Sequence, residues 1–546
     1  MVELLVLKAC YTMMIEILDY YERITVEIEG VAMGFWEEYS SNIGKLRTEY
    51  DLAAFCYDYL IGIVGDQECF IGKYILSNKK AAIVNPNLEQ LGHFSRQVER
   101  WLLKHDSDER HEALPFKHCM SGICESALKV IEHLEPYGEE ELNVATVSLY
   151  ILYAIDRYLG ESQMQRSGRM PKNVFYQKNS YIYLAPKHNI LDTAEEQLEF
   201  SHVIRPLLIR NQLKNIIILE QQEIKDKKPP EVVNLWISQQ DEDRRNVLAG
   251  KKLKVVVIPF EKEKMVQFPS MESGILFRVK YTDWYKEHGK GHALKLLDLA
   301  IGQKANIVIF PEYVCEPSVQ KAIGEHLREL YKRKPKFMKH LLLVVAGSGW
   351  TEDDNNVSCV YSYDGRILGR QYKTTKFNRK TEDGEGYLEG LSEPGRETTI
   401  FEVEGWGDIM LAICRDVSDP EALRTLAERF RPQFLLVPAW SSSIRNGFEQ
   451  QLGDITAKNH RTCSVVCNCC EAFGTKEENR DKSGMIVTPV KEGSLVKGKV
   501  DFIPRGAECW KDGTCGGCVW MVELCFEPDK VRNQKVVGKM KQKKCK

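Results

Sequence analysis

The sequence predicts an α/β protein preceded by a mainly α-helical domain. Apolar residues recur at helical spacing through roughly the first 165 residues, whereas short apolar strands alternate with amphipathic helices from about residue 254 onward. Polar stretches separate the two halves. A chain of 546 residues is also too long for one ordinary core, so two or three domains are expected.

The helical prediction for residues 1–168 depends on three apolar patterns. The first is a stripe of side chains three or four residues apart, formed by Leu4, Leu7, Tyr11, Met14, Ile15 and Leu18. The other two are "YDLAAFCYDYLIGIVG" and "ELNVATVSLYILYAIDRYL". Proline and glycine are sparse until "SGRMP" (Ser167 to Pro171), which predicts the end of this domain.

Residues 169–250 are expected to form a small mixed segment and a linker. "NVFYQKNSYIYLAP" is rich in aromatic and β-branched residues and predicts one or two strands, and "KNIIILEQQ" and "EVVNLWIS" are further short apolar runs. The polar stretch Lys225–Pro230 follows "KNIIILEQQ", and the polar stretch Gln239–Lys252 follows "EVVNLWIS". They place the main domain boundary between about 225 and 252.

Residues 251–530 show a regular alternation of strands and helices. "LKVVVIP", "NIVIFPE", "KHLLLVVAGSG", "IMLAIC" and "QFLLVPAW" are continuous apolar strands, and "HALKLLDLAIGQKA" is an amphipathic helix. Strands of this kind are typical of a sheet that is buried under helices.

Composition argues against several classes of protein. Hydrophobic residues make up 43% and charged residues 28%, and 75 basic against 78 acidic side chains give a net charge of −3, so no general affinity for nucleic acid or anionic membrane is expected. No segment resembles a membrane span or a signal peptide, which predicts a cytoplasmic protein whose 17 cysteines are reduced. The basic segment 531–546 is expected to be a solvated tail, with binding to nucleic acid or a protein partner as the weaker alternative.

Four polar or aromatic residues follow predicted strands directly. Glu312 follows "IVIFP", Lys373 follows "GRILGRQY", Cys414 follows "IMLAI" and Trp440 ends "FLLVPAW". Since sites in α/β sheets collect at the carboxyl ends of strands, these side chains are expected to converge.

Glutamate, lysine and cysteine together suit attack on an amide or nitrile carbon. A carboxylate takes the thiol proton and passes it to the leaving amine, while a lysine ammonium stabilises the oxyanion. The backbone N–H of Arg415 is a second candidate donor to that oxyanion.

The segment from about Lys252 to Asp529 resembles the carbon–nitrogen hydrolase (nitrilase/amidase) superfamily. The resemblance is carried by "FPE" at Phe310–Glu312, by "GRILGRQYK" ending at Lys373, and by the "C-x-D-x-x-x-P-E" run that begins at Cys414. "PAW" and the later "GMIVTPVKEG" are also similar to the family's pattern. Two charged residues depart from it, because Arg415 and Asp419 stand where the family usually has aromatic residues.

The resemblance implies an α-β-β-α sandwich and hydrolysis of a non-peptide carbon–nitrogen bond, more often in an amide than in a nitrile. The implied nucleophile is Cys414, the acid and base is Glu312, and the oxyanion lysine is Lys373, with Lys376 as a rival. A supporting glutamate is expected at Glu385, with Glu382 and Glu389 as alternatives.

Further residues have weaker roles in this interpretation. Arg415 and Asp416 would support the turn at the nucleophile, while Tyr313, Trp440 and Ser441 would line the pocket for a small amide or nitrile. No metal and no cofactor is implied, and a homo-oligomer is expected because family members commonly pair.

Other interpretations remain open. The hydrolase-like half would be a silent ligand-binding, scaffold or regulatory domain if it lacks turnover, since nitrilase-like domains also occur fused to other modules, including in bacterial antiphage systems. The N-terminal half would then bind a protein partner or sense a ligand. Cysteines at 467, 469 and 470, and the group at 509, 515 and 518, are interpreted as structural thiols in preference to zinc ligands.

Overall fold

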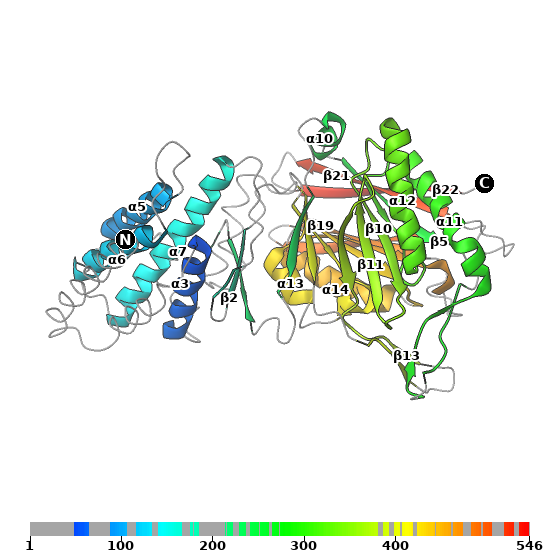
Figure 1. Cartoon of the computed structure of the whole chain (residues 1–546), viewed down its shortest axis with the longest axis horizontal. Coiled ribbons are helices and arrows are strands. Elements are labelled where there is room, and N and C mark those ends of the chain that lie inside the picture. Colours follow the sequence, from blue (N-terminus) through cyan, green and yellow to red (C-terminus); the bar gives the residue numbers. More distant parts are fainter. Residues whose placement is uncertain are drawn as a thin grey trace, which may run out of the picture. The chain divides into compact units, whose positions relative to one another are not determined.

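The computed structural model divides the chain into two compact units, and among the described residues the first unit ends at Glu220 and the second begins at Gln221 (Figure 1). The structure describes residues 48–64, 88–105, 116–133, 140–165, 175–177, 180–184, 213, 216–221, 229–235, 241–249, 252–260, 265–271, 274–380, 386–392, 398–403, 407–418, 423–442, 444–459, 462–472, 482–492, 495–504, 518–528 and 534–544. The stripe predicted from Leu4 to Leu18 lies outside them.

The first unit packs helices against one another and against a small sheet. Its helices are α3 (Glu49–Val64), α5 (Leu88–His105), α6 (Phe116–His133) and α7 (Glu140–Gln165), and α7 packs against α3, α5 and α6 (Figure 1). Strands β1 (Phe175–Gln177), β2 (Ser180–Leu184) and β3 (Ile216–Glu220) form an antiparallel sheet. Apolar side chains from both parts share one core, for example Leu52, Phe94, Leu152 and Ile218.

The residues described between 169 and 250, where a small mixed segment and a linker were expected, belong to both units. Strand β3 pairs with β2, and its Ile216 and Ile218 enter the helical core, so the described strands up to Glu220 belong to the first unit. Strand β4 (Glu231–Leu235) instead pairs with a strand of the second unit. The division therefore comes earlier than the predicted 225–252.

Two seven-stranded sheets form the second unit. The first sheet has the order β12-β11-β10-β9-β5-β21-β22, and the second has the order β20-β19-β18-β17-β16-β15-β4. The first contains β5 (Lys252–Phe260), β9 (Ile307–Ile309), β10 (Leu343–Trp350), β11 (Asn356–Ser362), β12 (Ile367–Tyr372), β21 (Cys518–Pro528) and β22 (Gln534–Lys544). The second contains, besides β4, β15 (Thr399–Val403), β16 (Gly407–Leu411), β17 (Phe434–Ala439), β18 (Cys463–Asn468), β19 (Lys482–Glu492) and β20 (Leu495–Pro504).

Helices cover the outer faces of these sheets. Helices α11 (Asp283–Gly302) and α12 (Pro317–Arg333) pack on the first sheet, and α14 (Ile444–Asn459) packs on the second together with α13 (Leu423–Phe430) (Figure 1). The inner faces meet in an apolar core to which Val255 and Ile307 contribute from one sheet and Leu411 and Leu436 from the other. The resulting order of layers is helix, sheet, sheet, helix, as expected for continuous apolar strands that are covered on both faces.

Parallel pairing brings several strand ends to one edge of each sheet. In the first sheet β9 runs parallel to both β5 and β10, and in the second β17 runs parallel to both β16 and β18. The expected strands before Glu312, Lys373, Cys414 and Trp440 are confirmed as β9, β12, β16 and β17.

A smaller sheet lies outside the two large ones. Strand β14 (Gly386–Glu389) pairs antiparallel with β13 (Asn378–Lys380) and parallel with the two-residue β7 (Leu276–Phe277). A short hairpin of β6 (Val266–Gln267) and β8 (Lys280–Tyr281) is nearby in sequence.

Two polar segments have more structure than the sequence predicted. The expectation of a solvated C-terminal tail is wrong for Gln534–Lys544, because these residues form the edge strand β22, which pairs with β21 along its whole length. The polar stretch Gln239–Lys252 contains helix α10 (Glu242–Ala249), which is fixed by a buried arginine. Arg244 donates to the carbonyl oxygens of Leu341 (2.9 Å) and Met338 (2.7 Å) and lies over the ring of Tyr363.

None of the described helices combines the length and the apolar character that crossing a membrane requires.

Candidate active site

Glu312 is a buried carboxylate whose two oxygens are both occupied. Its residue is 0% exposed, and its Oε2 accepts from the backbone N–H of Trp440 at 3.0 Å. Its Oε1 accepts from Lys373 Nζ at 2.7 Å and from Asn356 Nδ2 at 2.9 Å. Burial raises the pKa of Glu312 above its ordinary value, the charge of Lys373 opposes that rise, and the charge of Glu389 adds to it.

Lys373 is a buried cation held between two carboxylates. It is 1% exposed, and its Nζ lies 2.7 Å from both Glu312 Oε1 and Glu389 Oε2. Burial favours the neutral amine, but the charges of the two glutamates outweigh it and raise the pKa of Lys373. Lys373 therefore remains an ammonium. Its predicted rival Lys376 is half-buried and makes no ion pair with any carboxylate that the structure describes.

Cys414 begins the 3₁₀ turn Cys414–Ser418, three residues beyond the last residue of β16. Its backbone φ of 47° lies in the left-handed region, which non-glycine residues rarely adopt and which is common at functional turns. Its Sγ lies 3.7 Å from the carbonyl oxygen of Trp440, and the thiol also interacts with the Glu312 carboxylate. Burial and the charge of Glu312 raise the pKa of Cys414 well above that of a free thiol, against the opposing charge of Lys373.

Asp416 fixes the turn that presents this cysteine. Its Oδ1 accepts from the backbone N–H groups of Thr374 (2.9 Å) and Thr375 (2.8 Å), and its Oδ2 accepts from Ile413 N–H (3.0 Å). The carboxylate therefore connects the segment after Lys373 to the segment before Cys414. Burial raises the pKa of Asp416, while the charge of Lys373 and these hydrogen bonds oppose the rise.

The glutamate that the structure describes beside Lys373 is Glu389, one of the alternatives, while the favoured Glu385 and Glu382 lie outside the described residues. Glu389 is the last residue of β14 and is 0% exposed. Besides its ion pair with Lys373, it accepts from Phe377 N–H at 3.0 Å and from the Tyr313 hydroxyl at 2.5 Å. Glu389 reaches the lysine because it is the last residue of strand β14.

Tyr313 and Trp440 lie beside these charged groups, and Ser441 follows Trp440 in the chain. The hydroxyl of Tyr313 accepts from Lys373 Nζ over a long 3.4 Å, in addition to its bond to Glu389. The rings of Tyr313, Trp440 and Phe268 contact one another edge-on, with centroid separations of 5.9 to 6.0 Å. The backbone of Ser441 is held by the Asn468 side chain, through bonds of 2.8 and 2.9 Å.

Arg415 presents its side chain to solvent. It is exposed, and it makes no ion pair or side-chain hydrogen bond within the described part of the chain. Its charge therefore adds to the surface next to the nucleophile and is not neutralised by the carboxylates of Glu312, Glu389 or Asp416. Asp419, the other unusual charge, lies outside the described residues.

Asn356 is a site residue that the sequence interpretation missed. It is the first residue of β11, is 1% exposed, and bonds to Glu312. Its place follows from the pairing of β11 with β12: Val357 pairs with Tyr372, so Asn356 lies opposite Lys373, and the sequence interpretation did not include β11.

The other cysteine clusters have the features of packed thiols. Cys463, Cys467, Cys469 and Cys470 are buried, and burial raises the pKa of both Cys463 and Cys467. No group of three or more His, Cys, Asp or Glu residues that would suit a metal ion is found among the residues described. Cys509 and Cys515 lie outside that part of the chain.

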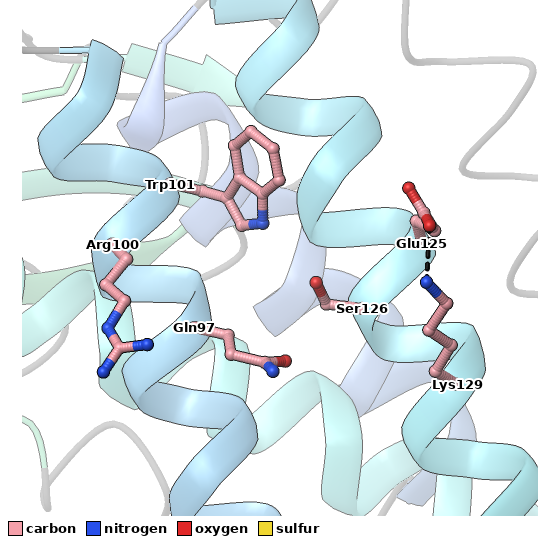
Figure 2. A pocket seen from close by; sticks show the side chains of 6 residues that line it. All are labelled: Gln97, Arg100, Trp101, Glu125, Ser126 and Lys129. Carbon is pink, nitrogen blue, oxygen red and sulfur yellow. Dashed lines mark hydrogen bonds and ion pairs between the residues drawn. The ribbon is translucent and has the colours of Figure 1, made fainter.

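The helical unit has a groove between α5 and α6. Figure 2 shows its lining, and the cavity volume is about 250 Å³. Glu125 and Lys129 form an exposed ion pair on one side, with Arg100 exposed on the other. The six lining residues are Gln97, Arg100, Trp101, Glu125, Ser126 and Lys129. Its polar, open character gives no indication of a particular ligand.

Comparison with known proteins finds similarity in solved structures alone. No family model matches the sequence, and the curated proteins give no match. A double mutant of the amidase from Nesterenkonia sp. AN1 in complex with acrylamide is similar over 48% of this chain and 95% of its own, with 14% identity and a TM-score of 0.31.

Two further structures are similar to the same extent. An amidase from Nesterenkonia sp. is 17% identical, with a TM-score of 0.28, over 47% of this chain and 94% of its own. A cysteine-to-alanine mutant of the Nesterenkonia AN1 amidase, described as a member of the nitrilase superfamily, is 16% identical, with a TM-score of 0.28, over 47% of this chain and 92% of its own.

Proposed function

We propose that the second unit is a hydrolase of non-peptide carbon–nitrogen bonds, of the nitrilase superfamily, and that its substrate is a small amide. The observation that carries this proposal is the buried ammonium of Lys373, held between Glu312 and Glu389 next to a cysteine at a strained turn. A structural thiol needs neither a carboxylate partner nor a left-handed backbone.

The first step is attack by Cys414 on the amide carbon. The charge of Glu312 and burial keep Cys414 as a thiol in the free protein, so the proton leaves only as the sulfur–carbon bond forms. Glu312 accepts that proton. The carbonyl oxygen becomes an oxyanion on a tetrahedral carbon.

The oxyanion is stabilised by Lys373 and by the backbone N–H of Arg415. Two N–H groups of Lys373 are directed to glutamates, and the third makes only the long 3.4 Å bond to Tyr313. A substrate oxygen is a stronger acceptor for this third N–H than the distant phenol oxygen. Developing negative charge is thereby stabilised more than the neutral amide, which is the requirement for catalysis.

The remaining steps use the same groups. Glu312 returns its proton to the leaving nitrogen as the carbon–nitrogen bond breaks, which leaves a thioester on Cys414 and releases ammonia or an amine. Glu312 then accepts a proton from water as the water oxygen attacks the thioester carbon. The carbon–sulfur bond breaks, Glu312 returns the proton to the Cys414 sulfur, and a carboxylic acid is released. This scheme requires no cofactor.

The test is the reactivity of Cys414 itself. The full-length protein is treated with iodoacetamide, and the alkylation rate of the peptide that contains Cys414 is measured by mass spectrometry. The peptide with buried Cys463 is the internal reference, because burial alone raises its pKa. We expect Cys414 to react faster than Cys463 and to slow in Glu312→Gln, while ammonia release from small amides is lost in Cys414→Ala.

Two outcomes would overturn the proposal. If Cys414 reacts no faster than Cys463 and Glu312→Gln changes nothing, the carboxylate does not activate the thiol, and the domain is better described as a silent binding or scaffold module. If ammonia release persists in Cys414→Ala, the nucleophile is another group. Homo-oligomer formation and a partner for the helical half stay predictions.

A further inference from the structure

Asn356 closes a ring of hydrogen bonds around the two glutamates. Its Nδ2 lies 2.9 Å from Glu312 Oε1 and 3.5 Å from Glu389 Oε1. Lys373 Nζ lies 2.7 Å from the same two side chains. Two carboxylates are thus bridged twice, once by a cation and once by a neutral amide.

The backbone of Asn356 also holds the lysine. Its carbonyl oxygen accepts from Lys373 N–H at 2.9 Å, just beyond the last pair of the β11–β12 ladder, Val357 and Tyr372. The main chain of Asn356 therefore fixes the backbone of Lys373, and the side chain of Asn356 fixes the position of Glu312.

The chemistry of the amide fixes which way it points. Both carboxylates are acceptors when ionised, so only the NH₂ end of Asn356 gives favourable contacts with them. The opposite end, Oδ1, is buried and has no hydrogen-bond partner in the described part of the chain. A buried acceptor without a partner is unfavourable, and its presence here indicates that the two donors are what this position requires.

A neutral donor is suited to this place because one lysine cannot neutralise two carboxylates. A second cation would complete the charge balance, but it would also lower the pKa of Glu312, so that Glu312 would accept the thiol proton less readily. Hydrogen bonds from an amide favour the ionised form more weakly than a cation does. Burial and the charge of Glu389 raise the pKa of Glu312, and a donated hydrogen bond opposes that rise.

We infer that Asn356 is a positioning residue of this site, which holds Glu312 and Glu389 around a single lysine so that Glu312 stays available as the proton acceptor for Cys414. The inference rests on the proposed function, in which Glu312 takes the cysteine proton. Asn356 does not touch the reacting atoms and acts through Glu312.

The pH dependence of Cys414 alkylation by iodoacetamide reports this role without a known substrate. In that reaction the thiol proton moves to Glu312, the sulfur–carbon bond forms, and iodide leaves with the electrons of the carbon–iodine bond. Asn356→Ala removes both donors, and Asn356→Asp keeps the shape but replaces the donors by a third carboxylate. Asn355→Ala is the matched control, because the Asn355 side chain bonds instead to the Asp353 carbonyl and to Ser392 in an adjacent loop.

We expect Asn356→Ala to slow alkylation at neutral pH by about 10-fold, the size of effect typical for a lost hydrogen bond to a charged group. The acid limb, the fall in alkylation rate at low pH as Glu312 becomes protonated, should move to higher pH in Asn356→Ala. It should move further in Asn356→Asp. Asn355→Ala should leave rate and limb unchanged. Thermal unfolding of each variant identifies those that fold.

Three outcomes would overturn the inference. The first is an unchanged rate and acid limb in both folded Asn356 variants. The second is a lower unfolding temperature with an unchanged pH profile, which indicates a purely structural residue. The third is an equal effect of Asn355→Ala. Glu312→Gln separates this failure from failure of the proposed function: if it slows alkylation while the Asn356 variants do not, the inference alone is wrong.

Discussion

Lys373 Nζ lies 2.7 Å from Glu389 Oε2, and this ion pair joins two different sheets of the second unit. Lys373 follows β12 at the edge of a seven-stranded sheet, whereas Glu389 ends β14 of the small three-stranded sheet. The charge of Glu389 thus reaches the lysine from a separately formed element. The position of Glu389 beside Lys373 therefore depends on how the small sheet packs against the large one.

Glu389 and Glu385 offer a matched pair of substitutions. Glu389→Gln removes one of the carboxylate charges that raise the pKa of Lys373 and weakens the bond from Tyr313, so we expect slower alkylation of Cys414 and lower stability. Glu385→Gln, four residues earlier, tests the glutamate that the sequence favoured, and it should change neither quantity if Glu389 alone supports Lys373. The measurement is alkylation rate together with urea unfolding. Slower alkylation in Glu385→Gln with none in Glu389→Gln would contradict the role of Glu389 and favour Glu385, as the sequence interpretation did.

Lys373→Met leaves two carboxylates buried without their cation. Loss of one partner from a buried ion pair typically costs about 3–5 kcal/mol, so we expect a loss of that size in the free energy of unfolding at neutral pH. Because Glu312 and Glu389 are 0% exposed, water cannot replace the ammonium. Urea unfolding provides the measurement.

The triple variant Lys373→Met, Glu312→Gln, Glu389→Gln controls for lost packing, because it removes the charges together with the cation. It should recover part of the lost stability. If the single and triple variants are equally unstable, the loss comes from the shape of the lysine side chain and not from its charge.

Much of this site follows from the sequence because strands with continuous apolar runs are easy to locate. Strands β9, β12, β16 and β17 end within two residues of the predicted runs, and Glu312, Lys373, Cys414 and Trp440 lie one to three residues beyond their ends. Sites in α/β sheets collect at the carboxyl ends of strands, so local patterns were sufficient to predict that Glu312, Lys373 and Cys414 come together.

The remaining site residues depend on pairing between distant or irregular strands. Glu389 is placed by β14, which pairs with the two-residue β7 from much earlier in the chain, and no local pattern encodes such a contact. Asn356 depends on the register of β11 against β12. Strand β22 was missed for another reason: an edge strand is held by backbone hydrogen bonds to β21, so its lysine-rich sequence need not be apolar.

The reactivity of Cys414 should fall at acid pH with a limb above the ordinary carboxyl pKa of 4.5. Glu312 must be ionised to accept the thiol proton, and because its pKa is raised in the folded protein, it becomes protonated at a higher pH than a free carboxyl. Since the charge of Lys373 lowers the pKa of Glu312, the limb should move further up in Lys373→Met. The measurement is the alkylation rate of the Cys414 peptide as a function of pH.

Glu312→Gln is the control for this profile, since an amide does not titrate. The acid limb should be absent in that variant. A limb that persists there belongs to another group, and a limb that moves to lower pH in Lys373→Met contradicts the electrostatic assignment.

Asp416→Asn tests the connection between the lysine segment and the nucleophile turn. One end of the asparagine amide is an NH₂ group, which cannot accept a hydrogen bond. In either orientation this end faces a buried backbone N–H, either that of Ile413 or those of Thr374 and Thr375, which then loses its acceptor. We expect a loss of about 1–3 kcal/mol in unfolding free energy and slower alkylation of Cys414. Ser418→Ala, in the same turn, is the control, since its hydroxyl makes one long 3.4 Å bond to Gly447. Similar losses in both variants would show that the turn is merely sensitive to substitution.

Two helical glycines give a matched test of the first unit. A Cβ on Gly122 in α6 would lie 2.3 to 2.6 Å from ring atoms of Trp101 in α5, whereas a Cβ on Gly92 would meet no atom within 4 Å. Overpacking of this kind typically costs about 1–3 kcal/mol, so Gly122→Ala should destabilise the packing of α5 on α6. Gly92→Ala should be neutral or stabilising by up to about 1 kcal/mol, since alanine favours a helix. Hydrogen exchange of peptides from Leu88–His105 and Phe116–His133 measures this locally, and equal exchange in the two variants would contradict the close contact of Trp101 with Gly122.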